Sequence, residues 1–291
     1  MTKLTQNKIL VPVDFSEQSL IALGQSYHTA REYNAELLLL HVMEDVGWMQ
    51  VSTTQLKEKK TSMQKKLDKL AEETSKTNKI AVDTMLAKGK VYEKIIEVAE
   101  MVNATMIIMG CNSKKRVGKL FIGSNALRVV RESICPVITV KGKQHREVFR
   151  NIVLPLDLTT ETRAKVKKAI EIANLGSFKP VIHVVSVLES ADEFFVNKLT
   201  AHMNQAKNFI EEQETECTAE IILKKKGDLP IAEYIIEYAN KVKGDLIIIM
   251  TQQETDFTGM FIGSTAQEIV NNSDIPVLSI IPTMHKYRME A

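Results

Sequence analysis

The sequence predicts an α/β protein that consists of two similar domains, each built on a five-stranded parallel sheet with helices on both faces. The first observation is an internal repeat: Phe121-Ile122-Gly123-Ser124 returns 140 residues later as Phe261-Ile262-Gly263-Ser264. The second is the alternation of short apolar runs with amphipathic stretches, with almost no hairpin signals between them. This alternation is typical of parallel sheets that are covered by helices on both faces.

Other landmarks of the first half return in the second half 140 to 143 residues later: Asp14 and Asp157, His41 and His183, and Pro136 and Pro276. Such self-similarity indicates one domain that occurs twice in tandem. A chain of 291 residues is long for a single core and suits two domains of roughly 140 residues. We expect these domains at residues 1–142 and 148–291, with the charged segment from Lys141 to Arg150 as their linker.

The composition restricts location and chemistry. A formal net charge of +2 argues against a general nucleic-acid surface. The first residues lack the apolar core of a signal peptide, and no apolar run approaches the roughly 18 residues of a membrane helix, so we expect a cytoplasmic protein without a membrane partner. Three scattered cysteines, with no histidine at zinc spacing, indicate free thiols and no metal site. A redox role for Cys111, if its thiol is exposed, is a weaker alternative.

The strands of the first repeat are expected at short apolar runs, because such runs are typical of parallel strands buried on both faces. The first run stops at Asp14, which places a carboxylate at a strand tip. Pro136 at the start of the last run fits an edge strand. In order, the runs are Lys8–Asp14, Glu36–Val42, Ile80–Ala87, Thr105–Gly110 and Cys135–Val140.

Helices are expected between these strands. Ser16 can cap the first helix, in which apolar residues recur at helical spacing until Asn34. The lysine-rich segment Thr54–Thr74 has one apolar side and one solvated face. The remaining helices are expected at Val91–Val102 and at Ser124–Arg131.

The second repeat restarts the same series of strands: Asn151–Asp157, Pro180–Val185, Thr218–Lys226, Asp245–Met250 and Ile275–Ile280. In each repeat the last strand is an apolar candidate for an exposed edge. Pairing these two edges with each other would cover both, so we predict an internal pseudo-dimer.

The loop between Gly110 and Ser124 has the composition of an anion site. A glycine at the strand exit lets a phosphate approach the backbone, and Gly123-Ser124 at a helix start offers free N–H groups and the positive end of the helix dipole. Between them lie four basic residues: Lys114, Lys115, Arg116 and Lys119. The alternative is that the glycines only turn the chain and the basic residues only solvate a loop.

The second repeat serves as an internal control for these alternatives. Met250, Gln253, Glu254 and Asp256 stand there in place of Gly110, Ser113, Lys114 and Arg116, while Gly263-Ser264 is retained. We therefore expect one anion site, in the first repeat, and a degenerate one in the second. Because Asp157 is retained as well, a loop-bracing or helix-capping role for the strand-end aspartates stays open. The two histidines, His41 and His183, are expected to be strand-end residues that bind neighbouring backbone rather than catalysts.

These residues resemble the universal stress proteins in their tandem form, over essentially the whole chain. The family's nucleotide motif G-x(2)-G-x(9)-G-[ST] is matched by Gly110, Ser113 and Gly123-Ser124, with Ser113 in place of the second glycine. The Val-Pro-Val-Asp strand that ends at Asp14 and the Cys-Pro-Val-Ile strand are also like the family. If position 113 needs a left-handed backbone, the serine costs roughly 1–2 kcal/mol.

The resemblance implies a Rossmann-like fold of the adenine nucleotide alpha hydrolase-like kind, strand order 3-2-1-4-5, and dimerisation through the fifth strand. It also implies, for some members, binding of ATP or AMP, often with a divalent metal such as Mg or Mn. The candidate nucleotide-binding residues are Pro12, Val13, Asp14, His41 and Val42 at the ends of the first two strands, and Gly110, Ser113, Arg116, Gly123, Ser124 and Asn125 in and after the loop.

Three functions are compatible with these observations. The first is a stress-response regulatory module that binds ATP or AMP in the first domain, with the second domain as its partner and a homodimer as a further assembly. The second is a scaffold, or a carrier of a small apolar ligand, which the apolar Met250 in place of Gly110 favours. An enzyme is the least favoured, because the chain has no P-loop lysine-serine pair and no G-x-S-x-G elbow.

Overall fold

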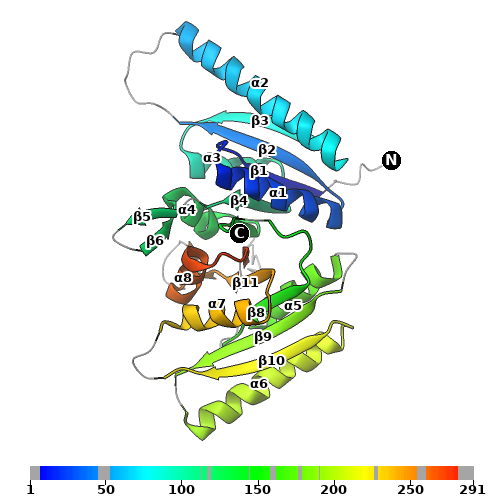
Figure 1. The fold of residues 1–291 in the computed structure, drawn as a ribbon, viewed down its shortest axis with the longest axis vertical. Coiled ribbons are helices and arrows are strands. Elements are labelled where there is room, and N and C mark those ends of the chain that lie inside the picture. Colours follow the sequence, from blue (N-terminus) through cyan, green and yellow to red (C-terminus); the bar gives the residue numbers. More distant parts are fainter. Residues whose placement is uncertain are drawn as a thin grey trace, which may run out of the picture.

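The computed structural model describes residues 7–44, 53–111, 113–116, 119–143, 145–157, 162–175, 179–189, 191–225, 229–253 and 260–280. The first repeat contributes five strands to the main sheet: β1 (Asn7–Pro12), β2 (Ala35–Met43), β3 (Val82–Lys88), β4 (Met106–Gly110) and β7 (Val137–Val140). The second repeat contributes β8 (Asn151–Pro155), β9 (Val181–Leu188), β10 (Cys217–Leu223), β11 (Leu246–Met250) and β14 (Val277–Ile280). These strands form one ten-stranded sheet across both repeats (Figure 1).

Within each repeat, the strands of the main sheet pair in parallel. The first repeat has the order β3-β2-β1-β4-β7 and the second the order β10-β9-β8-β11-β14. Both correspond to 3-2-1-4-5 when the strands are numbered within the repeat, the order that the resemblance implies. The predicted α/β fold with two Rossmann-like domains is confirmed.

In the described part of the chain, eight helices, four from each repeat, cover the two faces of the sheet. They are α1 (Glu17–Glu32), α2 (Thr53–Asn78), α3 (Val91–Met101), α4 (Ser124–Glu132), α5 (Thr162–Leu175), α6 (Glu193–Glu211), α7 (Ile231–Lys241) and α8 (Ser264–Asn272). One apolar core lies between the sheet and α1, α2, α5 and α6, and the other lies beneath α3, α4, α7 and α8. Each core therefore extends over both repeats.

The strands supply both cores because successive side chains point to opposite faces. In β2, Leu37 and Leu39 belong to the first core, whereas Leu38 and Leu40 belong to the second. All four are nearly inaccessible to solvent. This explains why the strands appear in the sequence as continuous apolar runs rather than as alternating patterns.

The two repeats meet at their fifth strands. β7 and β14 run antiparallel, with Ile138 opposite Leu278 and Thr139 opposite Val277. The Thr139 hydroxyl donates a hydrogen bond to the Val277 carbonyl oxygen at 3.3 Å. Because the two strands run in opposite directions, the carboxyl ends of the two sets of parallel strands lie at opposite edges of the ten-stranded sheet.

The linker after β7 packs along α1. The Gln25 side chain forms two hydrogen bonds with the Arg146 backbone: its amide donates to the carbonyl oxygen at 3.0 Å, and its oxygen accepts from the N–H at 2.7 Å. One turn further along the helix, the His28 ring stacks on the His145 ring with centroids 5.2 Å apart. The linker is therefore attached to the first domain by defined contacts.

The start of the linker also touches the second domain. Lys141 donates from Nζ to the carbonyl oxygen of Asn271, at 2.7 Å, near the end of α8. A Cβ on Gly142 would overlap the carbonyl oxygen of Asp274, so a glycine is needed where the two backbones pass. The linker thus contacts both repeats in the part of the chain that the structure describes.

The basic segment after β4 is not the plain loop that the sequence predicts. Its backbone forms an antiparallel hairpin of β5 (Ser113–Arg116) and β6 (Lys119–Ile122). A shorter hairpin, β12 (Gln252–Gln253) with β13 (Met260–Phe261), takes the same place in the second repeat. A run of charged residues conceals strands because the usual apolar alternation is missing.

Candidate functional site

The candidate site of the first repeat lies beyond the carboxyl ends of β1 and β4. Helix α1 follows β1 onto one face of the sheet, whereas α3 and α4, on either side of β4 in the chain, cover the other face. The point where helices leave to opposite faces is the switch point of an open parallel sheet, where such folds bind ligands. The chain beyond β1 continues this edge, since the Val13 N–H donates to the Leu40 carbonyl oxygen at 2.8 Å.

Asp14 braces the start of α1. Its Oδ1 accepts hydrogen bonds from the Ser16 backbone N–H at 3.0 Å and from the Ser16 hydroxyl at 2.6 Å. Partial burial would raise the pKa of Asp14, but the hydrogen bonds from Ser16 and Ser19 outweigh it and hold the pKa below its usual value. Ser16 is the N-cap of α1, as predicted. The loop-bracing role that the sequence left open for this aspartate is therefore observed.

Phe15 is a site residue that the sequence analysis missed. It has φ of 62°, in the left-handed region that costs a residue other than glycine roughly 1 kcal/mol. Its ring lies 5.2 Å from the His41 ring, and the Lys66 ammonium of α2 lies 4.0 Å from its centroid on another side. An aromatic residue between a strand-end aspartate and a helix cap was the available signal.

His41 binds backbone, as expected. Its Nδ1 lies 2.7 Å from the Val13 carbonyl oxygen, so this nitrogen donates and Nε2 is the acceptor in the neutral ring. Pro12 and Val42 are half-buried, and Val13 is buried beside them. These five sequence-predicted residues, Asp14 included, are brought together at the ends of β1 and β2.

The predicted equivalence of His41 and His183 is wrong. Pro12 pairs with Leu40 and Pro155 with Val185, so the residue after Val185, Ser186, is the counterpart of His41. His183 lies near the start of β9, where its ring nitrogens bind the Thr218 hydroxyl at 2.8 Å and the Asn151 side-chain oxygen at 3.0 Å. Strand pairing sets this register, and a sequence count alone does not detect it.

The structure explains the glycine at position 110 by close packing rather than by the predicted phosphate binding. A Cβ at this position would overlap the carbonyl oxygen of Gln18 and lie 2.8 Å from the backbone nitrogen of Ser19. The first turn of α1 therefore occupies the space beside Gly110 that the sequence analysis assigned to a phosphate. Met250 is its counterpart, since Gly110 pairs with Val140 and Met250 with Ile280. The methionine side chain is buried.

The prediction of an anion site rests on the start of α4, where a glycine cap precedes an exposed serine. Gly123 is the N-cap and brings no side-chain hydrogen bond, Ser124 is exposed, and Asn125 is half-buried. The first N–H groups of a helix have no partner within the helix, and here no cap side chain takes them. Ser113 and Arg116 lie on β5, but their side chains fall outside the described part of the structure.

The cysteines do not support redox chemistry. Cys111 is buried, and burial raises the pKa of its thiol to about 12, so the alternative of an exposed, reactive thiol is wrong. Cys135 and Cys217 are also buried and free, and burial raises the pKa of each.

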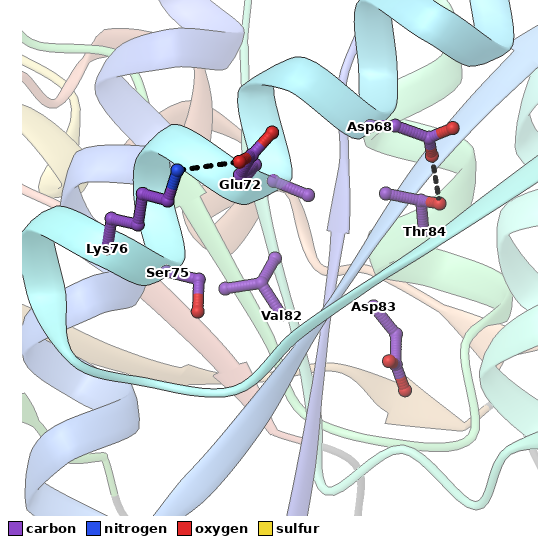
Figure 2. A pocket seen from close by; sticks show the side chains of 8 residues that line it. Asp68, Glu72, Ser75, Lys76, Val82, Asp83 and Thr84 are labelled. Carbon is purple, nitrogen blue, oxygen red and sulfur yellow. Dashed lines mark hydrogen bonds and ion pairs between the residues drawn. The ribbon is translucent and has the colours of Figure 1, made fainter.

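A hollow with a volume of about 470 Å³ lies between α2 and β3, apart from the site described above. Figure 2 shows Asp68 of α2 pointing to Thr84 of β3, while Lys76 points to Glu72 along the helix. Asp68 accepts a hydrogen bond from the Thr84 hydroxyl at 2.7 Å, and Glu72 pairs with Lys76 at 2.6 Å. The carboxylates of Asp68, Glu72 and Asp83 make this groove unsuitable for an anion. The described residues contain no group of three or more histidine, cysteine or acidic side chains placed to hold a metal.

The corresponding edge of the second repeat contains a cavity of about 280 Å³. It lies between the ends of β8, β9 and β11, helix α7 and the start of α8. Val185, Ile249 and Met250 form part of its wall, and Asp157 and Lys165 also line it.

The profile of the Universal stress protein family matches the chain twice, at residues 6–141 and 149–280. A universal stress protein of Methanocaldococcus jannaschii is 32% identical over 143 residues, which cover 46% of this chain and 81% of that protein. A universal stress protein of Mycolicibacterium smegmatis is 20% identical over 293 residues, which cover 96% of this chain and 98% of that protein. The second relative thus spans both repeats.

A solved structure shows the same fold over nearly the whole chain. The crystal structure of a universal stress protein from Archaeoglobus fulgidus superimposes with a TM-score of 0.77 at 18% identity, over 95% of this chain and 99% of that chain. Another universal stress protein from Archaeoglobus fulgidus, solved in complex with dAMP, matches 46% of this chain and 98% of that chain with a TM-score of 0.38 and 19% identity. Among the described residues, no helix has the length and apolar character needed to cross a membrane.

Proposed function

The chain belongs to the universal stress protein family, and on this premise we propose that it is a stress-response regulatory module whose first domain binds ATP or AMP. The observation that carries the proposal is the open start of α4 at the switch-point edge of the first repeat, with Gly123 as a cap that has no side chain. Backbone N–H groups at a helix start are suited to phosphate.

Different residues would contact the phosphates and the adenosine of the nucleotide. Phosphate oxygens would accept from the N–H groups at Ser124 and Asn125, with Ser113 and Arg116 of β5 as further ligands. Adenosine would lie toward Asp14, His41 and the adjoining residues Pro12, Val13 and Val42. Gly110 contributes indirectly, because its lack of a side chain lets α1 approach β4.

A divalent ion would accompany the nucleotide. Mg or Mn in nucleotide sites is commonly held by phosphates and water, with only one or two carboxylates. Asp14 is the described carboxylate at this edge, and its lowered pKa keeps it ionised at neutral pH. The ion would therefore arrive with the nucleotide rather than occupy a preformed protein site.

We propose binding rather than catalysis. Two side chains at this edge with groups suited to proton transfer are already engaged, since Asp14 accepts from Ser16 and His41 donates to Val13. An ionised aspartate with a lowered pKa is a weak base at neutral pH. Occupancy by nucleotide, rather than turnover, would be the signal.

The second domain would serve as a pseudo-dimer partner. The antiparallel contact of β7 with β14 supports this, because it takes the place that a second chain would occupy at the edge of a single domain. Association of two such chains into a homodimer is a further proposal. A cytoplasmic location is in keeping with three free, buried thiols.

A second candidate function is a scaffold or carrier that binds no nucleotide. The observation that favours it is the filled space beside Gly110, together with the partly apolar cavity in the second repeat. In this case the open start of α4 would have only a structural role.

The deciding experiment is mass spectrometry of the small molecules released when freshly purified, quantified protein is denatured, followed by calorimetric titration with ATP and AMP in Mg or Mn. About one adenine nucleotide per chain, or saturable binding with that stoichiometry, is the expected result. No released nucleotide and no binding heat with either metal would reject the proposal in favour of the scaffold or carrier.

A further inference from the structure

We propose that the cavity in the second domain binds a small, neutral and mainly apolar molecule, independently of nucleotide binding in the first domain. The cavity has a volume of about 280 Å³. Apolar cavities of about half this volume take up benzene. The volume is just below the roughly 300 Å³ at which pockets for larger organic ligands begin. A ligand of toluene size therefore fits.

One part of the cavity wall is apolar. Val185 of β9 and Ile249 and Met250 of β11 line it from the sheet, and all three are at most 5% exposed. Ile235 of α7 and Ile269 of α8, exposed by 4% and 1%, line it from the helices. Burial of a ligand against these side chains is favourable by about 25 cal/mol per Å² of apolar surface removed from water.

Another part of the cavity wall is polar and includes Gly263, Ser264 and Thr265 at the start of α8. Among the described lining residues, Lys165 is basic and Asp157 is acidic, so the pair carries no net charge. The Lys165 ammonium is directed to the Pro155 carbonyl oxygen, at 3.5 Å. Polar groups of this kind can orient a hydroxyl or carbonyl of a ligand, while the apolar wall supplies most of the contact.

Met250 differs from its first-repeat counterpart Gly110, and this difference shapes the cavity wall. At Gly110 the backbone of α1 comes into direct contact with the end of β4. A side chain at the corresponding position of β11 prevents the same approach, and Met250 instead contributes its thioether to the cavity wall. Methionine is flexible and polarizable, which suits it to ligands of varied shape.

The test uses the full chain with ¹³C-labelled isoleucine and methionine methyl groups, titrated with toluene. We expect saturable chemical-shift changes of the Ile235, Ile249 and Met250 methyls. Val187 also lines the cavity, and Val187→Phe should fill it and weaken binding at least tenfold. Strand pairing makes Val42 its counterpart in the first repeat, so Val42→Phe is the matched control and should leave these shifts unchanged.

Ala266→Phe, on α8, is a second filling variant, and dispersed methyl spectra verify that each variant is folded. No saturable shift up to the solubility limit of toluene would overturn the proposal. Shifts that survive both filling variants would place toluene elsewhere and also overturn it. AMP titrated into the same sample should leave these methyls unmoved, and AMP shifts that saturate there would contradict the apolar preference. Failure of AMP to bind the first domain would reject only the nucleotide proposal.

Discussion

Gly110 and Gln18 are so close that no side chain fits between the end of β4 and the first turn of α1. A Cβ on Gly110 would overlap the Gln18 carbonyl oxygen. The same glutamine donates from Nε2 to the carbonyl oxygens of Val140 at 3.2 Å and Gly142 at 3.1 Å. Gln18 thus connects the start of α1 with the end of β4, with β7 and with the linker. Gly110 belongs to the packing of this junction.

Gly110→Ala should destabilise the protein by about 2 kcal/mol, because the overlap is with backbone that cannot rotate away. Gly24→Ala is the matched control. There a Cβ would meet only the His145 ring, 2.8 Å away, which can turn, and alanine favours the helix by about 0.5–1 kcal/mol. Urea unfolding of both variants measures the difference. Equal free energies of unfolding for Gly110→Ala and Gly24→Ala would show that α1 can move away from a side chain at position 110.

Gly123→Ala should weaken ATP or AMP binding roughly tenfold, about 1.4 kcal/mol, by crowding the phosphates at the α4 start. Lys114→Glu should weaken it as well, because it places a negative charge in the basic hairpin. Gly263→Ala is the control, since Gly263 caps α8 in the same way and the two changes affect helix capping equally. Calorimetry measures the affinities. Similar losses from Gly123→Ala and Gly263→Ala would reject a single site in the first repeat.

Asp14→Ala should destabilise the protein by about 1 kcal/mol at pH 7, the usual effect of losing such a helix-start contact. The lowered pKa of Asp14 fixes the pH dependence. Its contribution is complete above the ordinary pKa of about 3.9 and is lost as the pH falls through the lower folded value. Unfolding measured from pH 7 to pH 3 should show the wild type and variant converging below about pH 4. A difference in unfolding free energy that stays constant from pH 7 to pH 3 would mean that the charge of the Asp14 carboxylate does not contribute to the bracing.

The contact between His28 and His145 should make stability depend on pH near neutrality. Burial lowers the pKa of His28, and the charges of His145 and Arg31 lower it further, while Glu147 opposes them. A lowered folded pKa means that the contribution is present above about 6.5 and declines as the pH falls from there. The free energy of unfolding should therefore drop between pH 7.5 and pH 5.

His28→Gln tests this dependence, because glutamine does not titrate. The variant should show a smaller drop in unfolding free energy than the wild type between pH 7.5 and pH 5. His202→Gln is the control, since His202 lies exposed on α6, away from the linker. An unchanged pH profile in His28→Gln would exclude the linker contact as the source of the dependence.

Much of the site was accessible from the sequence because it is encoded locally. Ser16 as a helix cap, Gly123-Ser124 at the start of α4 and Asp14 at a strand tip follow from short-range patterns. Phe15 was missed because only its place between Asp14 and the helix cap pointed to it, while nothing in the sequence signals its left-handed backbone. The role predicted for Gly110, the approach of a phosphate, was incomplete. A glycine permits the close approach of any group, and the sequence does not show which group it is.

The tandem repeat, the order of the main strands and helices and the asymmetry between the two loops can be predicted from the sequence, because they depend on periodicity, composition and residue type along the chain. Three features cannot: the packing of Gln18 on Gly110, the correspondence of Ser186 rather than His183 to His41, and the cavity of the second repeat. They depend on strand register and on how closely a helix approaches the sheet, and contacts between residues far apart in the chain set both.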